Sequence, residues 1–156
     1  MKEYLLDTFI YNDWANRQLL ETIFTLPEKE ESIIVFSHLI VAQDKWFNRI
    51  GKEKDDHTLS WSGSVFQEEE LADQWHQSVS QWIRFLESHP DSELNKDVTF
   101  IRQSDGKNMS VTIKDVMLQL NYHAIHHRAQ INRMISKQGI KPPATDYIYT
   151  VLKETS

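Results

Sequence analysis

Three histidines lie within five residues near the end of the chain, in the stretch NYHAIHHRAQINRMI at residues 121–135. On an α-helix, His123 and His127 are about 40° apart in projection and one turn apart along the axis, so both can bind one metal ion. His126 is three residues from His123, on its other side, and that pair is equally possible. The spacing therefore predicts a histidine pair for a divalent ion and leaves open which two residues form it.

A catalytic ion needs at least a third protein ligand, and His38 is the best candidate for it. His38 interrupts the apolar stretch SIIVFSHLIVA at residues 32–42. An isolated histidine in such surroundings is costly unless it is hydrogen-bonded or metal-bound. His38 alone also fits an ordinary core residue, and the later pair alone also fits a solvated helix face. Together they favour a metal site, because helical bundles build such sites from inward-facing side chains on different helices.

Polar residues near these histidines have possible supporting roles. Gln119 lies one turn before His123, and Gln130 lies two turns after it on nearly the same face. A metal-bound histidine usually donates its second ring nitrogen to an acceptor, and either glutamine oxygen can serve. Lys45 lies two turns after His38 and could neutralise an anionic substrate, although a lysine reaching solvent from a helix end is the simpler interpretation. Three further histidines are interpreted as solvated: His57, His76 and His89.

Helices must position these residues. Apolar periodicity and helix-breaking residues predict four helices, over about residues 2–24, 32–50, 64–88 and 112–138. Gly51 and Gly139 are suited to end the second and the last of them. Ser64 with Gln67, and Thr112 with Asp115, resemble capping boxes that begin the third and the last.

The segment between Val98 and Val111 has a different pattern. Its β-prone residues alternate with period two on either side of an Asp105-Gly106 turn, which predicts a small hairpin or extended loop before the last helix. With no internal repeat, residues 1–156 are expected to form one all-α domain, a four-helix bundle. The five tryptophans are expected mainly in the core, with Trp61 a possible wall of a pocket.

Composition excludes several classes of protein. The net charge is −6 and acids and bases are interspersed, so there is no basic stripe for nucleic acid. No apolar run approaches a membrane span, and the N-terminus does not resemble a signal peptide, so a cytoplasmic protein without a membrane partner is expected. The sequence has no cysteine, which leaves His, Asp and Glu as the ligands for any metal.

Three segments carry a resemblance to a known family. They are YxxWAN at residues 11–16, SHLIVAQDKWFNRI at residues 37–50, and H-x-x-x-H-R-x-Q at residues 123–130, followed by Gly139, Pro142, Pro143 and Asp146. Together the sequence resembles the DinB/YfiT-like superfamily of small bacterial metalloenzymes, which is distinct from the DNA polymerase that shares the DinB name. Ala129 departs from the glycine that commonly follows the arginine in this family, and the change does not touch a ligand.

The resemblance implies a four-helix bundle with a crossover connection, often a homodimer. It also implies a divalent ion held by one histidine of the second helix and two of the last, here His38, His123 and His127. Carried over in this way, the family pattern selects His127 over His126. Imidazole ligands suit several divalent metals, and we expect zinc or nickel.

Three histidines leave one or more positions of the ion open to a small-molecule substrate. Members of the family include transferases that act with bacillithiol or mycothiol, and metal-dependent hydrolases. The first hypothesis is therefore a metal-dependent transferase of a low-molecular-weight thiol of the bacillithiol type. The alternatives are a metal-dependent hydrolase and a non-enzymatic metal-binding bundle of the stress response. No residue can be named as a general base.

Overall fold

The helices of the predicted bundle are present in the computed structural model, which describes residues 1–51 and 66–155. The elements are α1 (Lys2–Phe24), α2 (Glu30–Gly51), α3 (Glu68–Ser88), η1 (Asp91–Asn95), β1 (Asp97–Ile101), β2 (Asn108–Thr112), α4 (Ile113–Lys137) and η2 (Tyr147–Thr150). The predicted all-α fold with a small hairpin before the last helix is confirmed. In the described part of the chain, no helix has both the length and the apolar character needed to cross a membrane.

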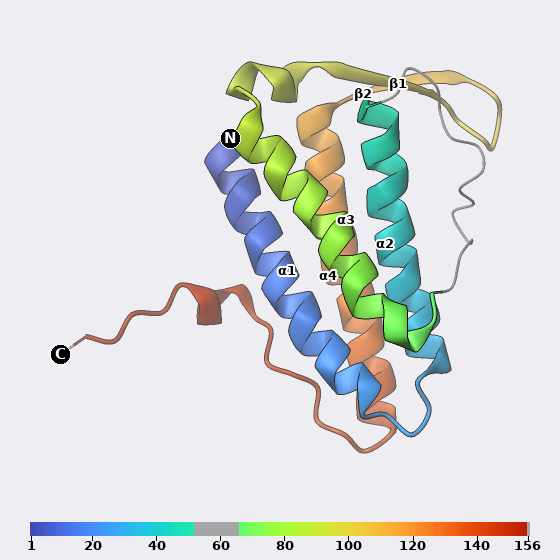
Figure 1. The fold of residues 1–156 in the computed structure, drawn as a ribbon, viewed down its shortest axis with the longest axis vertical. Helices are drawn as coiled ribbons and strands as arrows, with labels where there is room; N and C mark the ends of the chain where they lie inside the picture. Colours follow the sequence, from blue (N-terminus) through green and yellow to red (C-terminus); the bar gives the residue numbers. More distant parts are fainter. Residues whose placement is uncertain (52–65, 156) are drawn as a thin grey trace.

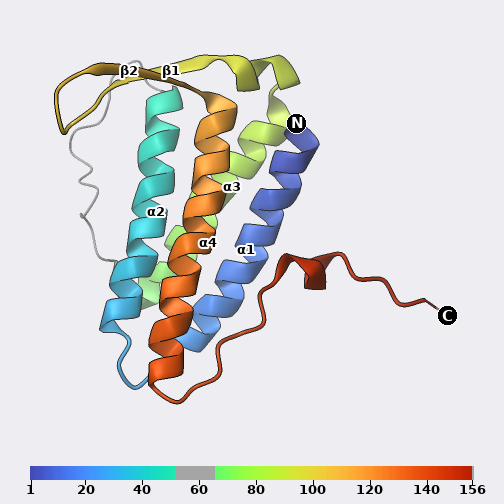
Figure 2. The ribbon, with the colours of Figure 1, turned by 180° about the vertical axis from the view of Figure 1, so that it is seen from behind.

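The four long helices lie side by side, and their directions explain which of them meet (Figures 1 and 2). α1 and α4 run one way, and α2 and α3 run the other. α2 and α3 follow each other in the chain and are parallel, so α3 begins at the opposite end of the bundle from the end of α2. α1 contacts α3 and α4, and α2 contacts the same two helices. The helix that carries His38 therefore lies beside the one that carries His123 and His127.

Local sequence fixes the start of α3 and α4. The hydroxyl of Thr112 accepts a hydrogen bond from the backbone N–H of Asp115, as the predicted cap requires. α3 begins later than predicted: Gln67 is its N-cap, and Gln67 and Glu70 form the capping box. Ser64 lies outside the described residues. The predicted capping box paired Ser64 with Gln67. The side chains that cap the helix are those of Gln67 and Glu70, three residues further along.

The β-hairpin closes one end of the bundle (Figure 1). Val98 pairs with Val111 across the two antiparallel strands, and Val98 is buried with the helix core. The rings of Trp46 on α2 and Phe100 on β1 make an edge-to-face contact with centroids 5.2 Å apart. The hairpin thus extends the apolar core past the end of α2.

Tryptophan burial agrees only partly with the expectation. Trp75 and Trp82 are fully buried, while Trp14 and Trp46 are half-buried. Trp61, expected as a possible pocket wall, lies outside the described residues. The aromatic core therefore rests on α3, where Trp82 stacks on Phe9 of α1 with centroids 5.8 Å apart.

Candidate metal centre

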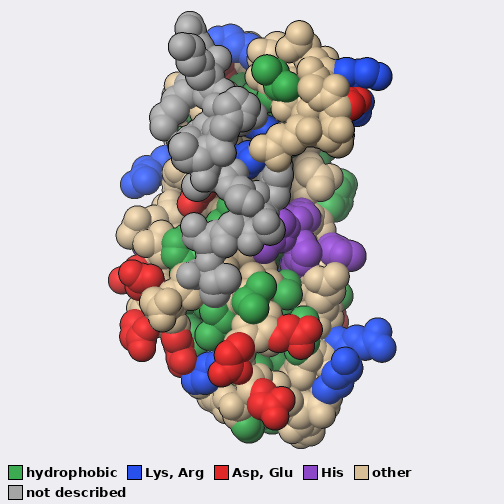
Figure 3. Space-filling model, turned by 90° about the vertical axis from the view of Figure 1, so that its right-hand side faces the viewer, with side chains coloured by type: hydrophobic (Ala, Val, Ile, Leu, Met, Phe, Trp, Pro, Cys, Tyr) green, Lys and Arg blue, Asp and Glu red, His purple; other side chains and the backbone are tan. Residues whose placement is uncertain are grey.

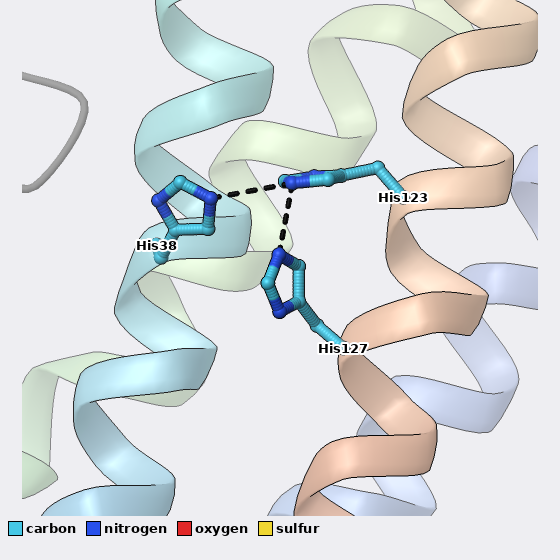
Figure 4. Close-up of side chains that lie close together, drawn as sticks. All are labelled: His38, His123 and His127. Carbon is cyan, nitrogen blue, oxygen red and sulfur yellow. Dashed lines mark hydrogen bonds between the residues drawn. The ribbon is translucent and has the colours of Figure 1, made fainter.

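Three imidazole rings converge between α2 and α4 (Figure 4). His38 comes from α2, and His123 and His127 come from successive turns of α4. The Nε2 atom of His123 is 3.2 Å from that of His38 and 2.9 Å from that of His127. The ring centroids of His38 and His127 are 4.9 Å apart. Residues that are 85 positions apart in the chain thus place their ring nitrogens at one point.

This arrangement fits a divalent ion. One ligand atom from each histidine can be chosen so that all three lie within 4.8 Å of one another. Histidine nitrogens about 2.0–2.1 Å from a tetrahedral ion are roughly 3.3 Å apart, close to the two Nε2 separations. His123 lies between the other two, so it would bind the ion together with His38 of α2 and His127 of α4. Three protein ligands leave a coordination position for a substrate.

The structure brings His127, and not His126, to the centre. His126 is exposed, and its Nε2 faces the amide nitrogen of Gln130 at 3.2 Å. The spacing along α4 left these two residues equivalent, and the position of α2 separates them, since His38 lies on the side of His127. That these histidines bind metal remains a prediction.

Gln130 fixes the orientation of the His127 ring. Its Oε1 lies 2.7 Å from Nδ1 of His127, and because an amide oxygen only accepts, Nδ1 carries the proton. In the neutral ring the lone pair is then on Nε2, the atom that faces His123. This is the acceptor role predicted from the sequence for either Gln119 or Gln130, and Gln130 performs it.

Burial and the neighbouring rings lower the basicity of two of these histidines, His123 and His127. Burial, followed by the positive charges that His127 and His38 would carry, lowers the pKa of His123 from 6.5 to about 4. Burial likewise lowers the pKa of His127, against the opposing effect of the hydrogen bond that His127 donates to Gln130. Metal binds only the neutral imidazole. At neutral pH the His123 ring is therefore unprotonated and suited to bind a cation.

The metal-free protein should consequently lose stability in mild acid. The unfolded chain protonates His123 near pH 6.5 and the folded chain only near pH 4, so protons favour the unfolded state between these values. The free energy of unfolding should fall as pH decreases from about 6.5 to about 4, measured by denaturant titration in a chelator. His123→Gln removes the group and should flatten this part of the profile. An equally steep fall in that variant would contradict the assignment.

Removal of the Gln130 acceptor should weaken metal binding without removing a ligand. Gln130→Ala is expected to lower affinity about tenfold, since partners that orient a ligand typically contribute 10–100-fold. The measurement is competition with a chromogenic chelator. Gln119→Ala is the matched control, because in the described part of the chain Gln119 makes no hydrogen bond to a histidine. Equal affinities in the two variants would refute the orienting role.

A hollow of about 470 Å³ opens beside the histidines. Its described walls are His38 and His123 with Ala42, Trp46, Gln119 and Leu120. Figure 3 shows histidine side chains gathered at the surface on one face of the molecule. An aromatic ring and two aliphatic side chains thus stand next to the candidate metal centre.

Two interpretations from sequence need revision or extension. Lys45 is only 1% exposed, so the interpretation of Lys45 as a lysine that reaches solvent from the helix end is wrong.

The second is Arg128, which the sequence showed only as part of a motif. Its guanidinium donates hydrogen bonds at 3.0 Å to Asn12, Asn16 and Tyr11. These residues belong to the YxxWAN stretch, so two motifs distant in sequence meet in the core. In the sequence, the signal for this contact was the pair of asparagines, Asn12 and Asn16, one turn apart on the first helix together with Arg128 on the last.

Comparison with known proteins agrees with this picture. The family model described as the DinB superfamily matches residues 27–131, a range that includes His38, His123 and His127. A curated relative, Protein DinB of Bacillus subtilis (strain 168), is 23% identical over an alignment 172 residues long. The alignment covers 99% of this chain and 98% of the relative. No solved structure matches the chain significantly.

Proposed function

The chain belongs to the DinB superfamily, and on that premise we propose that it binds zinc or nickel at His38, His123 and His127 and transfers a low-molecular-weight thiol of the bacillithiol type to an electrophile. The observation that carries this proposal is the histidine group beside an apolar hollow. A divalent ion bound there would supply a Lewis acid that lowers the pKa of a thiol or water beside it.

The side chains around the centre favour a thiol over water as the nucleophile. Among the described residues of the hollow there is no carboxylate that could remove a proton from water. A thiol needs less help, because its ordinary pKa is about 8.5 and it ionises readily beside a cation. The chain has no cysteine, so the sulfur would come from the substrate.

The chain's own residues would bind and position the reactants. His38 and the α4 pair hold the ion, and Gln130 keeps His127 in the ligand tautomer. Trp46, Ala42 and Leu120 give the electrophile an apolar surface that also excludes water from part of the site. In the reaction the thiol sulfur forms a bond to carbon, the bond from that carbon to its leaving group breaks, and the thiol proton passes to solvent.

The test is thiol consumption by metal-loaded protein. Bacillithiol and an alkyl or aryl halide would be mixed with zinc-loaded and nickel-loaded protein, and loss of free thiol followed with time. We expect a rate above that of the uncatalysed reaction, which disappears in chelator and in His38→Ala. Product release from an ester without thiol would support a hydrolase instead. Absence of turnover with full metal content would support a non-enzymatic, metal-binding role in stress response.

A further inference from the structure

A second hollow, of about 510 Å³, lies between α1 and the residues that follow α4. After α4 the chain returns past α1 before it leaves the helices (Figures 1 and 2). The described walls of the hollow come from successive turns along one side of α1 and from the segment 147–151. This hollow shares no described residue with the one beside the histidines, so it is a separate candidate site.

Aromatic side chains from both sides wall this hollow. They are Tyr11, Trp14, Tyr147 and Tyr149. The ring centroids of Tyr11 and Trp14 are 6.4 Å apart, and the rings of Tyr11 and Tyr147 meet edge-to-face at 5.3 Å. The rings are thus close neighbours that stand at different angles. The face of an aromatic ring is negative, so rings grouped around a hollow favour a cation.

Tyr11 holds this arrangement in place from the core. Its hydroxyl donates a hydrogen bond to the carbonyl of Thr145 at 2.8 Å and accepts one from Arg128 at 3.0 Å. Thr145 is buried, so the segment 147–151 is fixed to α1 at its start. The guanidinium carbon of Arg128 is 5.2 Å from the centroid of the Tyr11 ring. Tyr11 therefore already contacts a cation of the protein, and the other three rings are left for a ligand.

The formal charge of the hollow is negative. Among its described walls the charged side chain is Asp7, which is exposed. Within residues 1–51 and 66–155, Asp7 makes no ion pair. The whole chain carries a net charge of −6. A carboxylate beside aromatic faces attracts a cation and repels an anion.

The hollow offers few acceptors for an ammonium that carries protons. A primary ammonium has three N–H donors, and it loses hydrogen bonds to water unless acceptors replace them. The Tyr11 hydroxyl already accepts from Arg128, and the Thr150 hydroxyl donates to the Tyr147 carbonyl at 2.7 Å. A quaternary ammonium has no N–H donor to satisfy, and its methyl groups pack on aromatic faces. The volume lies in the range of small-molecule sites.

We propose that this hollow binds a small molecule that carries a quaternary, methylated ammonium group. The methyl groups lie against the rings of Trp14, Tyr147 and Tyr149, and the carboxylate of Asp7 balances the positive charge. Because the histidines take no part in it, this binding is independent of the metal and of the proposed transferase reaction. Either function can therefore fail in experiment without the other.

The test compares choline with two probes that each lack one of its features. 3,3-Dimethylbutan-1-ol has the shape of choline without the charge, and methylammonium has the charge on a protonated nitrogen. Each is titrated into the full chain, and the NMR resonance of the Trp14 indole N–H, assigned by its loss in Trp14→Phe, reports binding. We expect choline to bind at least about tenfold more tightly than either probe. No saturable shift with choline, or equal affinity for either probe, would overturn the proposal.

Substitutions then locate the bound cation. Tyr149→Leu should weaken choline binding about two- to fivefold, the effect of one ring at an exposed site. Asp7→Asn should weaken it about two- to threefold, as expected for an exposed ion pair. Both side chains are exposed, so helical content should not change. Tyr122→Leu, at an exposed tyrosine of α4 outside this hollow, is the matched control and should bind like wild type. Equal affinities in Tyr149→Leu and Tyr122→Leu would contradict the site.

Discussion

His123→Ala is expected to lower metal affinity by at least about 100-fold, a larger loss than that of an orienting partner. His123 is the central member of the group, with its Nε2 at 3.2 Å and 2.9 Å from those of His38 and His127. Without it the remaining two imidazoles come from different helices and give only two ligands. Elemental analysis of untagged protein purified without added metal measures the effect, and His38→Ala and His127→Ala should lose metal as well.

His126→Ala is the matched control for that experiment. It removes an imidazole from the same turn of α4, but its ring is exposed and makes its hydrogen bond with Gln130 rather than with another histidine. Full metal content in this variant, beside loss in the other three, supports the ligand set. Loss of metal in His126→Ala to the same extent, or retention in His123→Ala, contradicts it.

The sequence predicted the elements well where local chemistry determines them. Thr112 caps α4 as expected, and Gly139 has a φ of +74° just past its end, a conformation that glycine adopts without strain. α3 shows the limit of local patterns. Ser64 and Gln67 both begin a sequence that resembles a capping box, and only the formed structure shows that Gln67 and Glu70 pair.

The candidate site required tertiary information. Spacing along α4 leaves His126 and His127 equivalent relative to His123, and the decision comes from α2, which places His38 on one side of α4. The burial of Lys45 could not be predicted from the sequence either, because burial depends on the tertiary contacts of α2 and not on the residue pattern of the helix alone. The family resemblance selected the same histidines, since it carries the helix arrangement implicitly.

Arg128→Leu should be the most destabilising single substitution outside the apolar core. The Arg128 side chain is almost fully buried, and its two terminal nitrogens donate to Asn12, Asn16 and Tyr11. Leucine would leave these oxygens without their donor in the core, at about 1–3 kcal/mol for each unsatisfied group. We expect the free energy of unfolding to fall by about 3–5 kcal/mol, measured by urea titration with metal present at saturation.

The reason for so large a loss is geometric, and Arg128→Lys tests it. An ammonium keeps the charge but lacks the planar fork that reaches several acceptors at once, so lysine should restore only part of the stability. Arg133→Leu, at an exposed position of the same helix, should change it by less than about 0.5 kcal/mol. If Arg128→Lys were as stable as wild type, a positive charge at this position would be enough to stabilise the fold. The three-acceptor geometry that joins α4 to α1 would then not be what stabilises this part of the core.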